Sequence, residues 1–99
     1  MAQFDFYPQR GAPGYWLDCQ TDFMDDYDTR FVVPLLPCEN VPLPVRHLNP
    51  VFDIGGRRHT MATQYASSIP VSELRAKMGS LAKRHDDIIR ALDFLFSGI

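Results

Sequence analysis

The spacing of apolar residues changes about two thirds of the way along the chain. Near the start, Phe4 and Phe6 alternate with Gln3 and Asp5, and residues 15–20 have the same extended character after a loop rich in proline and glycine. Short alternating segments separated by turn residues are typical of antiparallel strands. We therefore expect the chain to begin with a hairpin that has a long loop.

Two further strand regions follow the first hairpin. Residues 31–36 form an almost continuous apolar run, which predicts a strand buried on both faces. Pro34 interrupts this run, and we expect an edge or a bulge there because proline cannot donate to a strand ladder. Four prolines between residues 37 and 50 predict a surface loop. Residues 51–62, with a Gly-Gly pair near their centre, predict a tight hairpin.

After Pro70 the apolar residues recur every three or four positions, as on one face of a helix. The residues with this spacing are Leu81, Ile88, Ile89, Leu92, Leu95 and Phe96. We expect Ser80 to be the N-cap, Gly98 to end the helix, and His85 to be a structural histidine on the apolar face. The predicted fold class is mainly β with a C-terminal α-helix, in the form of a small barrel.

Length and charge narrow the possible functions. A chain of 99 residues cannot support two separate hydrophobic cores, so we expect one domain over residues 1–99. Hydrophobic residues make up 45%, enough to form a core, which argues against disorder. Such a domain buries only about 60% of its unfolded surface, so a homodimer is a natural supplement. The net charge of −2 argues against a general nucleic-acid binder and favours a protein partner.

No sequence feature predicts a membrane segment, a cofactor or a catalytic motif. No apolar run approaches the roughly 20 residues of a membrane helix, and no signal peptide is evident, so we expect a cytoplasmic protein without a membrane partner. Zinc spacings, phosphate loops and serine nucleophile elbows are absent, and we predict no metal and no cofactor. Cys19 and Cys38 are interpreted as reduced small hydrophobes, with a disulfide as the less favoured alternative.

An acidic turn carries two adjacent apolar residues. Phe23 and Met24 lie within the segment Asp22–Asp28, which contains four aspartates. Neighbouring residues on an extended segment point to opposite faces, so we expect one of the pair to be exposed. A calcium loop would need a central glycine and a bidentate glutamate, which this segment lacks. We interpret the aspartates as a solvated turn.

The predicted helix has two unusual features near its end. Phe94 falls about 140° from the centre of the apolar stripe, and a large aromatic there should meet a partner. The alternatives are packing on a neighbouring loop or on a second copy of the chain. The final residues, Phe96 to Ile99, are apolar where most chain ends are polar. The simpler explanation for the ending is a helix C-cap with a packed isoleucine.

Charged residues after the Gly-Gly pair permit an enzymatic hypothesis. Arg57, Arg58 and His59, together with Asp53, could form an acid-base set that cleaves RNA. Such catalysis needs these groups within hydrogen-bond reach, and the spacing alone does not establish that. We favour solvated hairpin residues, because the acidic chain offers no broad track for phosphates.

Short motifs in a fixed order run through the whole chain. They are Gln3-Phe4, Asp18-Cys19-Gln20-Thr21-Asp22, Val32-Val33-Pro34-Leu35, Pro50-Val51, Ile54-Gly55, Met61, Thr63 and Ser68-Ile69-Pro70-Val71-Ser72. In these motifs and their spacing the chain resembles the CcdB family of toxins from bacterial toxin-antitoxin pairs. Only the proline loop departs from the family in length.

The resemblance implies a homodimer built on an SH3-like barrel of the CcdB/MazF type with a C-terminal helix. Family members bind the dimerisation region of the A subunit of DNA gyrase and trap the enzyme on cleaved DNA. A labile CcdA-like antitoxin removes them, and the pair regulates its own transcription, so the toxin meets DNA only through the antitoxin. The resemblance thus implies a poison rather than an enzyme, with no catalytic residue. The residues that would bind the antitoxin are not assigned.

The resemblance also implies which residues would contact gyrase. By position they are Phe23, Met24, Asp93, Phe96, Ser97, Gly98 and Ile99. The family tail commonly reads Phe-Trp-Gly-Ile, and Ser97 replaces the tryptophan, which removes a cation-π contact of about 0.5–2 kcal/mol. Asp93 stands where better-known members have an amide. We expect the acidic turn and the chain end to come together as one docking face.

Two alternatives to gyrase poisoning stay open. The chain could keep the fold but no longer poison gyrase, because Ser97 replaces the tryptophan. It could instead be a ribonuclease toxin of the MazF type, which would require Arg57, Arg58 or His59 to act on RNA.

Overall fold

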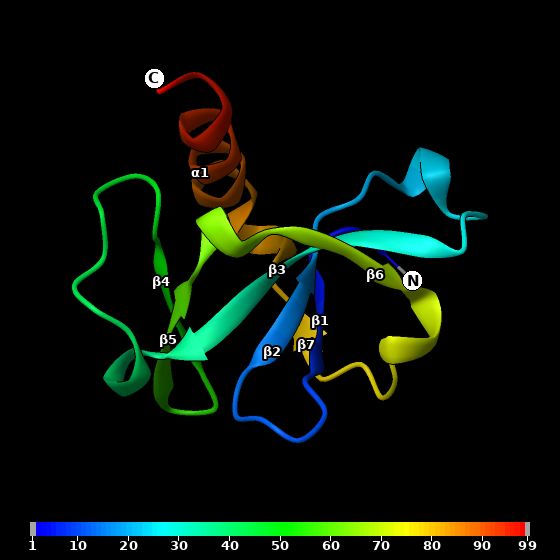
Figure 1. Ribbon diagram of the computed structural model, residues 1–99, viewed down its shortest axis with the longest axis horizontal. Helices are drawn as coiled ribbons and strands as arrows, with labels where there is room; N and C mark the ends of the chain where they lie inside the picture. Colours follow the sequence, from blue (N-terminus) through cyan, green and yellow to red (C-terminus); the bar gives the residue numbers. More distant parts are fainter. Residues whose placement is uncertain (1, 99) are drawn as a thin grey trace.

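Antiparallel strands form one curved sheet, a half-barrel, and a single helix follows at the carboxyl end (Figure 1). The computed structural model of the protein describes residues 2–98. The strands are β1 (Asp5–Pro8), β2 (Tyr15–Asp18), β3 (Thr29–Pro37), β4 (Val51–Ile54), β5 (Arg57–Met61), β6 (Ser67–Pro70) and β7 (Gly79–Ser80). The helix is α1 (His85–Ser97). The predicted class, mainly β with a C-terminal helix, is confirmed.

Short 3-10 turns connect many of these elements. They are η1 (Asp22–Met24), η2 (Cys38–Asn40), η3 (Thr63–Tyr65), η4 (Val71–Glu73) and η5 (Ala82–Arg84). The sheet runs in the order β4-β5-β3-β2-β1-β7, with β6 paired to β3 beside β5. Both predicted hairpins, β1–β2 and β4–β5, are therefore present. The predicted proline loop is confirmed as exposed chain after η2.

Strand β3 lies at the centre of the sheet. One of its edges pairs with β2, while the other pairs with β6 over residues 29–32 and with β5 over residues 35–37. The carbonyl of Pro34 accepts a hydrogen bond from the Ala62 amide at 2.9 Å, on the side of β5 and β6. The N and C=O groups of a strand residue point to the same side. The N–H that proline lacks would therefore point to the place where β3 changes its partner from β6 to β5, so no ladder bond is lost there. The predicted interruption is confirmed, but the edge position is wrong.

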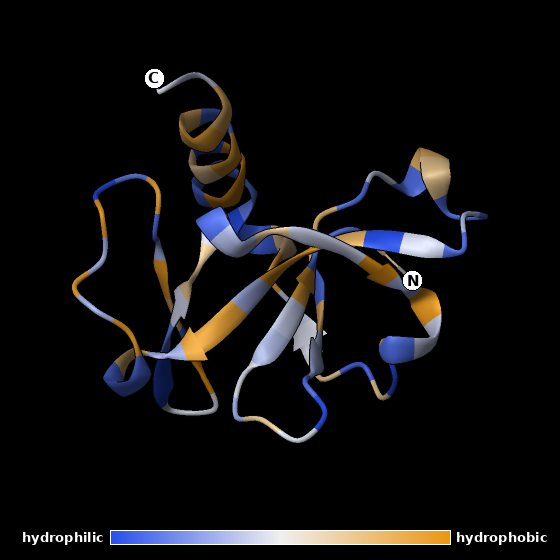
Figure 2. Cartoon of the chain, in the orientation of Figure 1, coloured by the Kyte–Doolittle hydropathy of each residue, from blue (hydrophilic) through white to orange (hydrophobic). Residues whose placement is uncertain are grey.

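Alternating side chains of the strands build two cores on opposite faces of the sheet. The larger core contains Phe6, Leu17, Leu35 and Met61, and α1 adds Ile88 to it. The smaller core contains Tyr7, Val32 and Leu74, with Trp16 and Ile69 packed against it. Figure 2 shows hydrophobic residues along β3 and α1, both of which contribute to these cores.

The beginning of the helix differs from the prediction, and its end agrees with it. The turn η5 lies between Ser80 and α1, so the Ser80 hydroxyl accepts a hydrogen bond from Ala82 N at 3.1 Å and caps that turn instead of α1. His85 is the first residue of α1 and is exposed, not buried on the apolar face; its ring packs against that of Phe4 with 5.5 Å between the centroids and 75° between the planes. Gly98 ends the helix with φ +73°, and its N–H donates to the Phe94 carbonyl at 2.8 Å.

The last turns of α1 extend beyond the sheet that supports its first turns (Figure 1). Ile88 and Ala91 are fully buried, whereas Leu95 and Phe96 are exposed. The sheet therefore covers the apolar face of the first turns but not of the last turn, because no strand lies beneath it. Within residues 2–98, no helix has the length and apolar character needed to cross a membrane.

Candidate functional site

The acidic turn projects from the end of β2 and exposes an aromatic side chain. Phe23 is 99% exposed and Met24 is 36% exposed. The prediction that one of the two is exposed is confirmed for Phe23. Their extended arrangement is wrong, because the segment forms the 3-10 turn η1, in which Thr21 Oγ1 accepts from Phe23 N at 3.4 Å. Asp22 also accepts a hydrogen bond from Gln3 N, at 2.8 Å.

One carboxamide, that of Gln20, joins the two arms of the acidic turn. Its Nε2 donates to the carbonyls of Met24, at 3.2 Å, and Thr29, at 3.1 Å. Its Oε1 accepts from Phe31 N at 2.9 Å. The Gln20 side chain therefore links the two arms of the turn, the chain up to Met24 and the start of β3, in place of main-chain hydrogen bonds between them.

Arg30 lies fully buried beneath the same turn. Its Nη2 and Nε lie 2.7 Å and 3.0 Å from Oδ2 of Asp18, which is also fully buried. Its Nη1 reaches Asp25 Oδ1 at 3.4 Å, and its Nη2 reaches the Gln20 carbonyl at 3.4 Å. Burial raises the pKa of the Asp18 carboxyl, and the hydrogen bond from Arg30 opposes that rise. An arginine beside an apolar run was the only sequence signal for this cluster.

The carboxylates of the turn do not assemble into a metal site. Asp25 is committed to Arg30, and Asp22 to the main chain of Gln3. Among residues 2–98, no group of three or more potential metal-ligating side chains is present.

The end of α1 carries the second set of predicted site residues. Phe96 is 72% exposed, and Asp93 and Gly98 are also exposed. The hydroxyl of Ser97 donates to the Asp93 carbonyl at 2.8 Å, so it is used within the helix. Ile99 lies outside the described residues. The helix thus presents one large aromatic, Phe96, at its exposed end.

Phe94 is half-buried against the proline loop. Its ring centroid lies 6.3 Å from that of His47, a loop residue with a positive φ of 69°. Phe94 therefore packs on a neighbouring loop of its own chain, which was one of the two alternatives for this residue. Figure 1 shows this loop standing beside α1.

The two sets of predicted site residues do not meet within one copy of the chain. Phe23 and Met24 share η1, while Asp93, Phe96, Ser97 and Gly98 share the end of α1. In Figure 1 both project above the sheet, α1 to the left and the turn η1 to the right, with β3 and β6 between them. The turn and the helix end are therefore two separate projections of one copy, and their joining into a single docking face stays a prediction.

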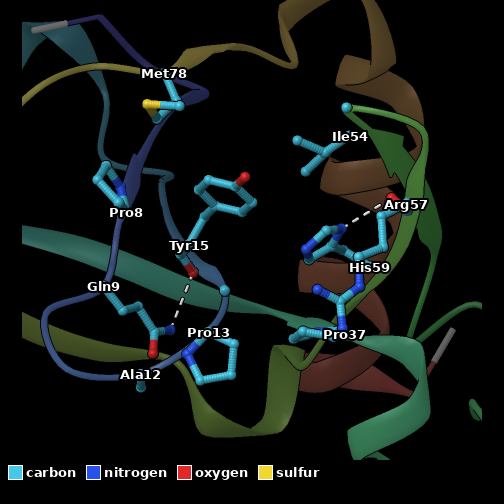
Figure 3. A pocket seen from close by; sticks show the side chains of 12 residues that line it. Pro8, Gln9, Ala12, Pro13, Tyr15, Pro37, Ile54, Arg57, His59 and Met78 are labelled. Atoms are coloured by element: carbon cyan, nitrogen blue, oxygen red, sulfur yellow. Dashed lines mark hydrogen bonds between the residues drawn. The ribbon is translucent and has the colours of Figure 1, made fainter.

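Arg57 and His59 of the β4–β5 hairpin line one side of a cavity of about 390 Å³, and the β1–β2 loop lines the other side (Figure 3). His59 is buried, with its ring centroid 5.2 Å from that of Tyr15 and Nδ1 3.0 Å from the Arg57 carbonyl. The interpretation of His59 as a solvated residue is wrong, because the register turns it inward beside Phe52. Arg57 pairs with Glu39.

The proposed acid-base set is divided between two faces of that hairpin. Asp53 lies directly across from Arg58, whereas His59 lies across from Phe52. Side chains of successive strand residues point to opposite faces, so Asp53 and Arg58 face away from the side that holds His59. The arrangement does not bring a carboxylate to the imidazole.

A comparison with protein families agrees with this architecture. The family model described as CcdB protein matches residues 3–98, nearly the whole chain. The chain belongs to the CcdB family. CcdB proteins are toxins of toxin-antitoxin pairs and are poisons rather than catalytic enzymes, and the half-barrel with its C-terminal helix is consistent with a CcdB-like fold.

Both cysteines of this CcdB chain are free thiols. Burial raises the pKa of the Cys19 thiol far above its ordinary value, which keeps it protonated and unreactive. Cys38 Sγ lies 3.2 Å from Thr60 Oγ1. The interpretation of the two residues as reduced is confirmed.

Proposed function

We propose that this protein is a homodimeric cytoplasmic toxin that binds the A subunit of DNA gyrase, traps gyrase on cleaved DNA, and is neutralised by a CcdA-like antitoxin. The observation that carries the proposal is the exposure of Phe96, at 72%, and Phe23, at 99%, on the two elements where the resemblance to the family implies the gyrase contacts. Neither ring is needed for the packing of the chain itself.

Exposed aromatics of this kind are suited to protein recognition. A large aromatic contributes much contact area, and aromatic residues are enriched among those that dominate binding energy. Ser97 supplies no aromatic surface, so Phe96 and Phe23 are the anchors in this proposal. A homodimer carries two copies of each projection, which gives the partner four aromatic anchors.

Growth and DNA cleavage test the proposal directly. The protein is expressed in bacteria, and the purified protein is added to gyrase and plasmid DNA to measure trapped cleavage complexes. We expect growth arrest and trapping, and we expect Phe23→Ala and Phe96→Ala to weaken both by tenfold or more, about 1.4 kcal/mol. Leu43→Ala is the matched control, because Leu43 is 93% exposed in the proline loop. Normal growth with no gyrase binding overturns the proposal.

Ser97 favours a second candidate, a relative that no longer poisons gyrase. Its hydroxyl is bonded to the Asp93 carbonyl and provides no surface for a cation-π contact. In that case the native protein is harmless and Ser97→Trp creates toxicity. Ser97→Leu controls for added apolar area without an aromatic face.

The ribonuclease alternative has less support from the geometry. His59 is buried beside Tyr15, and Arg57 is paired with Glu39. Cellular RNA from the growth experiment tests this point, since a ribonuclease toxin would cleave RNA and lose that activity in His59→Ala.

A further inference from the structure

We infer that Gln20 and Arg30 are positioning residues that form a polar clamp and hold the acidic turn in the conformation that displays Phe23. The inference rests on the proposed function, because it assigns the clamp a role in binding through Phe23. It adds residues that do not themselves face the partner.

The acidic turn has no hydrophobic anchor of its own. Every residue from 21 to 29 is exposed, and η1 buries none of its side chains. A segment without buried apolar contacts opens easily unless other interactions hold it. Hydrogen bonds therefore hold this turn: a few main-chain bonds within it, such as Tyr27 N to the Met24 carbonyl at 3.2 Å, and bonds to groups outside it that fix it on the sheet.

Gln20 provides bonds to both arms of the turn at once. Its carboxamide bonds Met24 at the end of η1 and Thr29 and Phe31 on β3, over 2.9–3.2 Å. Both carboxamide atoms are used, so the side chain is held in a single orientation. Loss of this one group would release three main-chain atoms.

Arg30 anchors the clamp in the interior of the protein. Its guanidinium joins Asp18 on β2, the carbonyl of Gln20 and the carboxylate of Asp25 after η1. Asp18 in turn accepts from Gln20 N at 3.1 Å through its second oxygen. Strong directional bonds of this kind fix the turn relative to β2 and β3.

A held turn matters for binding because ordering a loop on association costs free energy. With the clamp closed, Phe23 is presented without that cost. Replacing Gln20 should therefore weaken binding when Phe23 is present and have little effect when Phe23 has been replaced by alanine.

The test combines amide hydrogen exchange with a double-mutant cycle. In the free protein, Gln20→Ala should speed exchange at residues 22–27 by about tenfold and leave core amides such as Leu35 unchanged. Affinity for the purified A subunit of gyrase should fall about tenfold in Gln20→Ala. In the Phe23→Ala background the same change should cost less than about twofold.

Two further variants keep the result interpretable. Gln9→Ala is the matched control, since Gln9 Nε2 also donates to a main-chain carbonyl, that of Tyr15, at 3.1 Å, but in another loop. It should change neither exchange at the turn nor affinity. Asp25→Asn weakens only one arm of the clamp at a half-exposed side chain, so it should fold and show a smaller change of the same kind.

Each outcome separates the clamp from the proposed function. Unchanged exchange at residues 22–27 in Gln20→Ala overturns the clamp, whatever gyrase does. Additive losses of affinity in the double variant overturn the positioning role while gyrase binding stands. Full affinity of Phe23→Ala overturns the proposed role of that residue, and the exchange measurement then still decides whether the clamp exists.

Discussion

Nη2 of Arg30 lies 2.7 Å from Oδ2 of Asp18, and neither side chain reaches solvent. Burying two charges is costly, and their attraction offsets that cost only when the geometry is good and the remaining donors are bonded. The additional bonds from Arg30 to Gln20 and Asp25 meet that requirement. The pair connects the interior of the sheet to the acidic turn.

Removing one member of this pair should destabilise the fold strongly. Arg30→Met leaves the Asp18 carboxylate buried without its partner, and we expect unfolding free energy to fall by about 3–5 kcal/mol in urea titrations. Arg90→Met, at an exposed helix position, should stay within about 0.5 kcal/mol. A loss below about 1 kcal/mol in Arg30→Met would show that the pair is not stabilising in this sense.

The cost of Arg30→Met should depend on pH. Burial already raises the folded-state pKa of Asp18, and the hydrogen bond from Arg30 opposes that rise. In Arg30→Met the folded-state pKa of Asp18 should rise further. The variant is then most stable at low pH, where Asp18 is protonated, and loses stability as the pH rises through that pKa and Asp18 becomes charged. We expect the difference between native protein and variant to be smaller near about pH 4 than near about pH 7. A difference that grows on acidification contradicts this sign.

Gly14 should tolerate no side chain, unlike Gly11 in the same loop. A Cβ at Gly14, where φ is +111°, would lie 2.5 Å from the Leu35 carbonyl oxygen, whereas nothing lies within 4 Å at Gly11. We expect Gly11→Ala to cost about 1 kcal/mol from its positive φ alone. Gly14→Ala should cost at least about 2 kcal/mol more, since a backbone atom must move. Thermal unfolding of both variants checks the difference, and equal costs would contradict it.

The two ends of α1 should differ in their importance for stability. Ile88→Ala removes a fully buried side chain, and we expect a loss of about 2–4 kcal/mol in denaturant unfolding. Phe96→Ala should change the unfolding free energy by less than about 0.5 kcal/mol, because the ring is 72% exposed. A large loss in Phe96→Ala would mean that this ring packs on the protein, for example across a dimer.

Local patterns were sufficient for most of the longer elements of this fold, but not for the short strands β6 and β7 or for the 3-10 turns. Alternation in β1 and β2, the Gly-Gly turn between β4 and β5, and the C-cap at Gly98 all agree with the structure. These features depend on backbone geometry within a few residues, which the sequence expresses directly. The sequence predicted that one residue of the pair Phe23 and Met24 is exposed, although the segment is a 3-10 turn and not extended.

Other features depended on which elements lie next to each other. The sequence alone could not show that Arg30 and His59 are buried. Nor could it show that α1 extends beyond the sheet and leaves Phe96 exposed. It also could not show that the acidic turn and the helix end stand apart as two projections above the sheet. Periodicity and turns are properties of neighbours in the chain, whereas burial and the grouping of site residues depend on strand pairing between distant segments. The sequence therefore determined the main hairpins, the central strand, the helix and the likeness to a family, and only the tertiary structure decided which side chains are buried, paired or exposed.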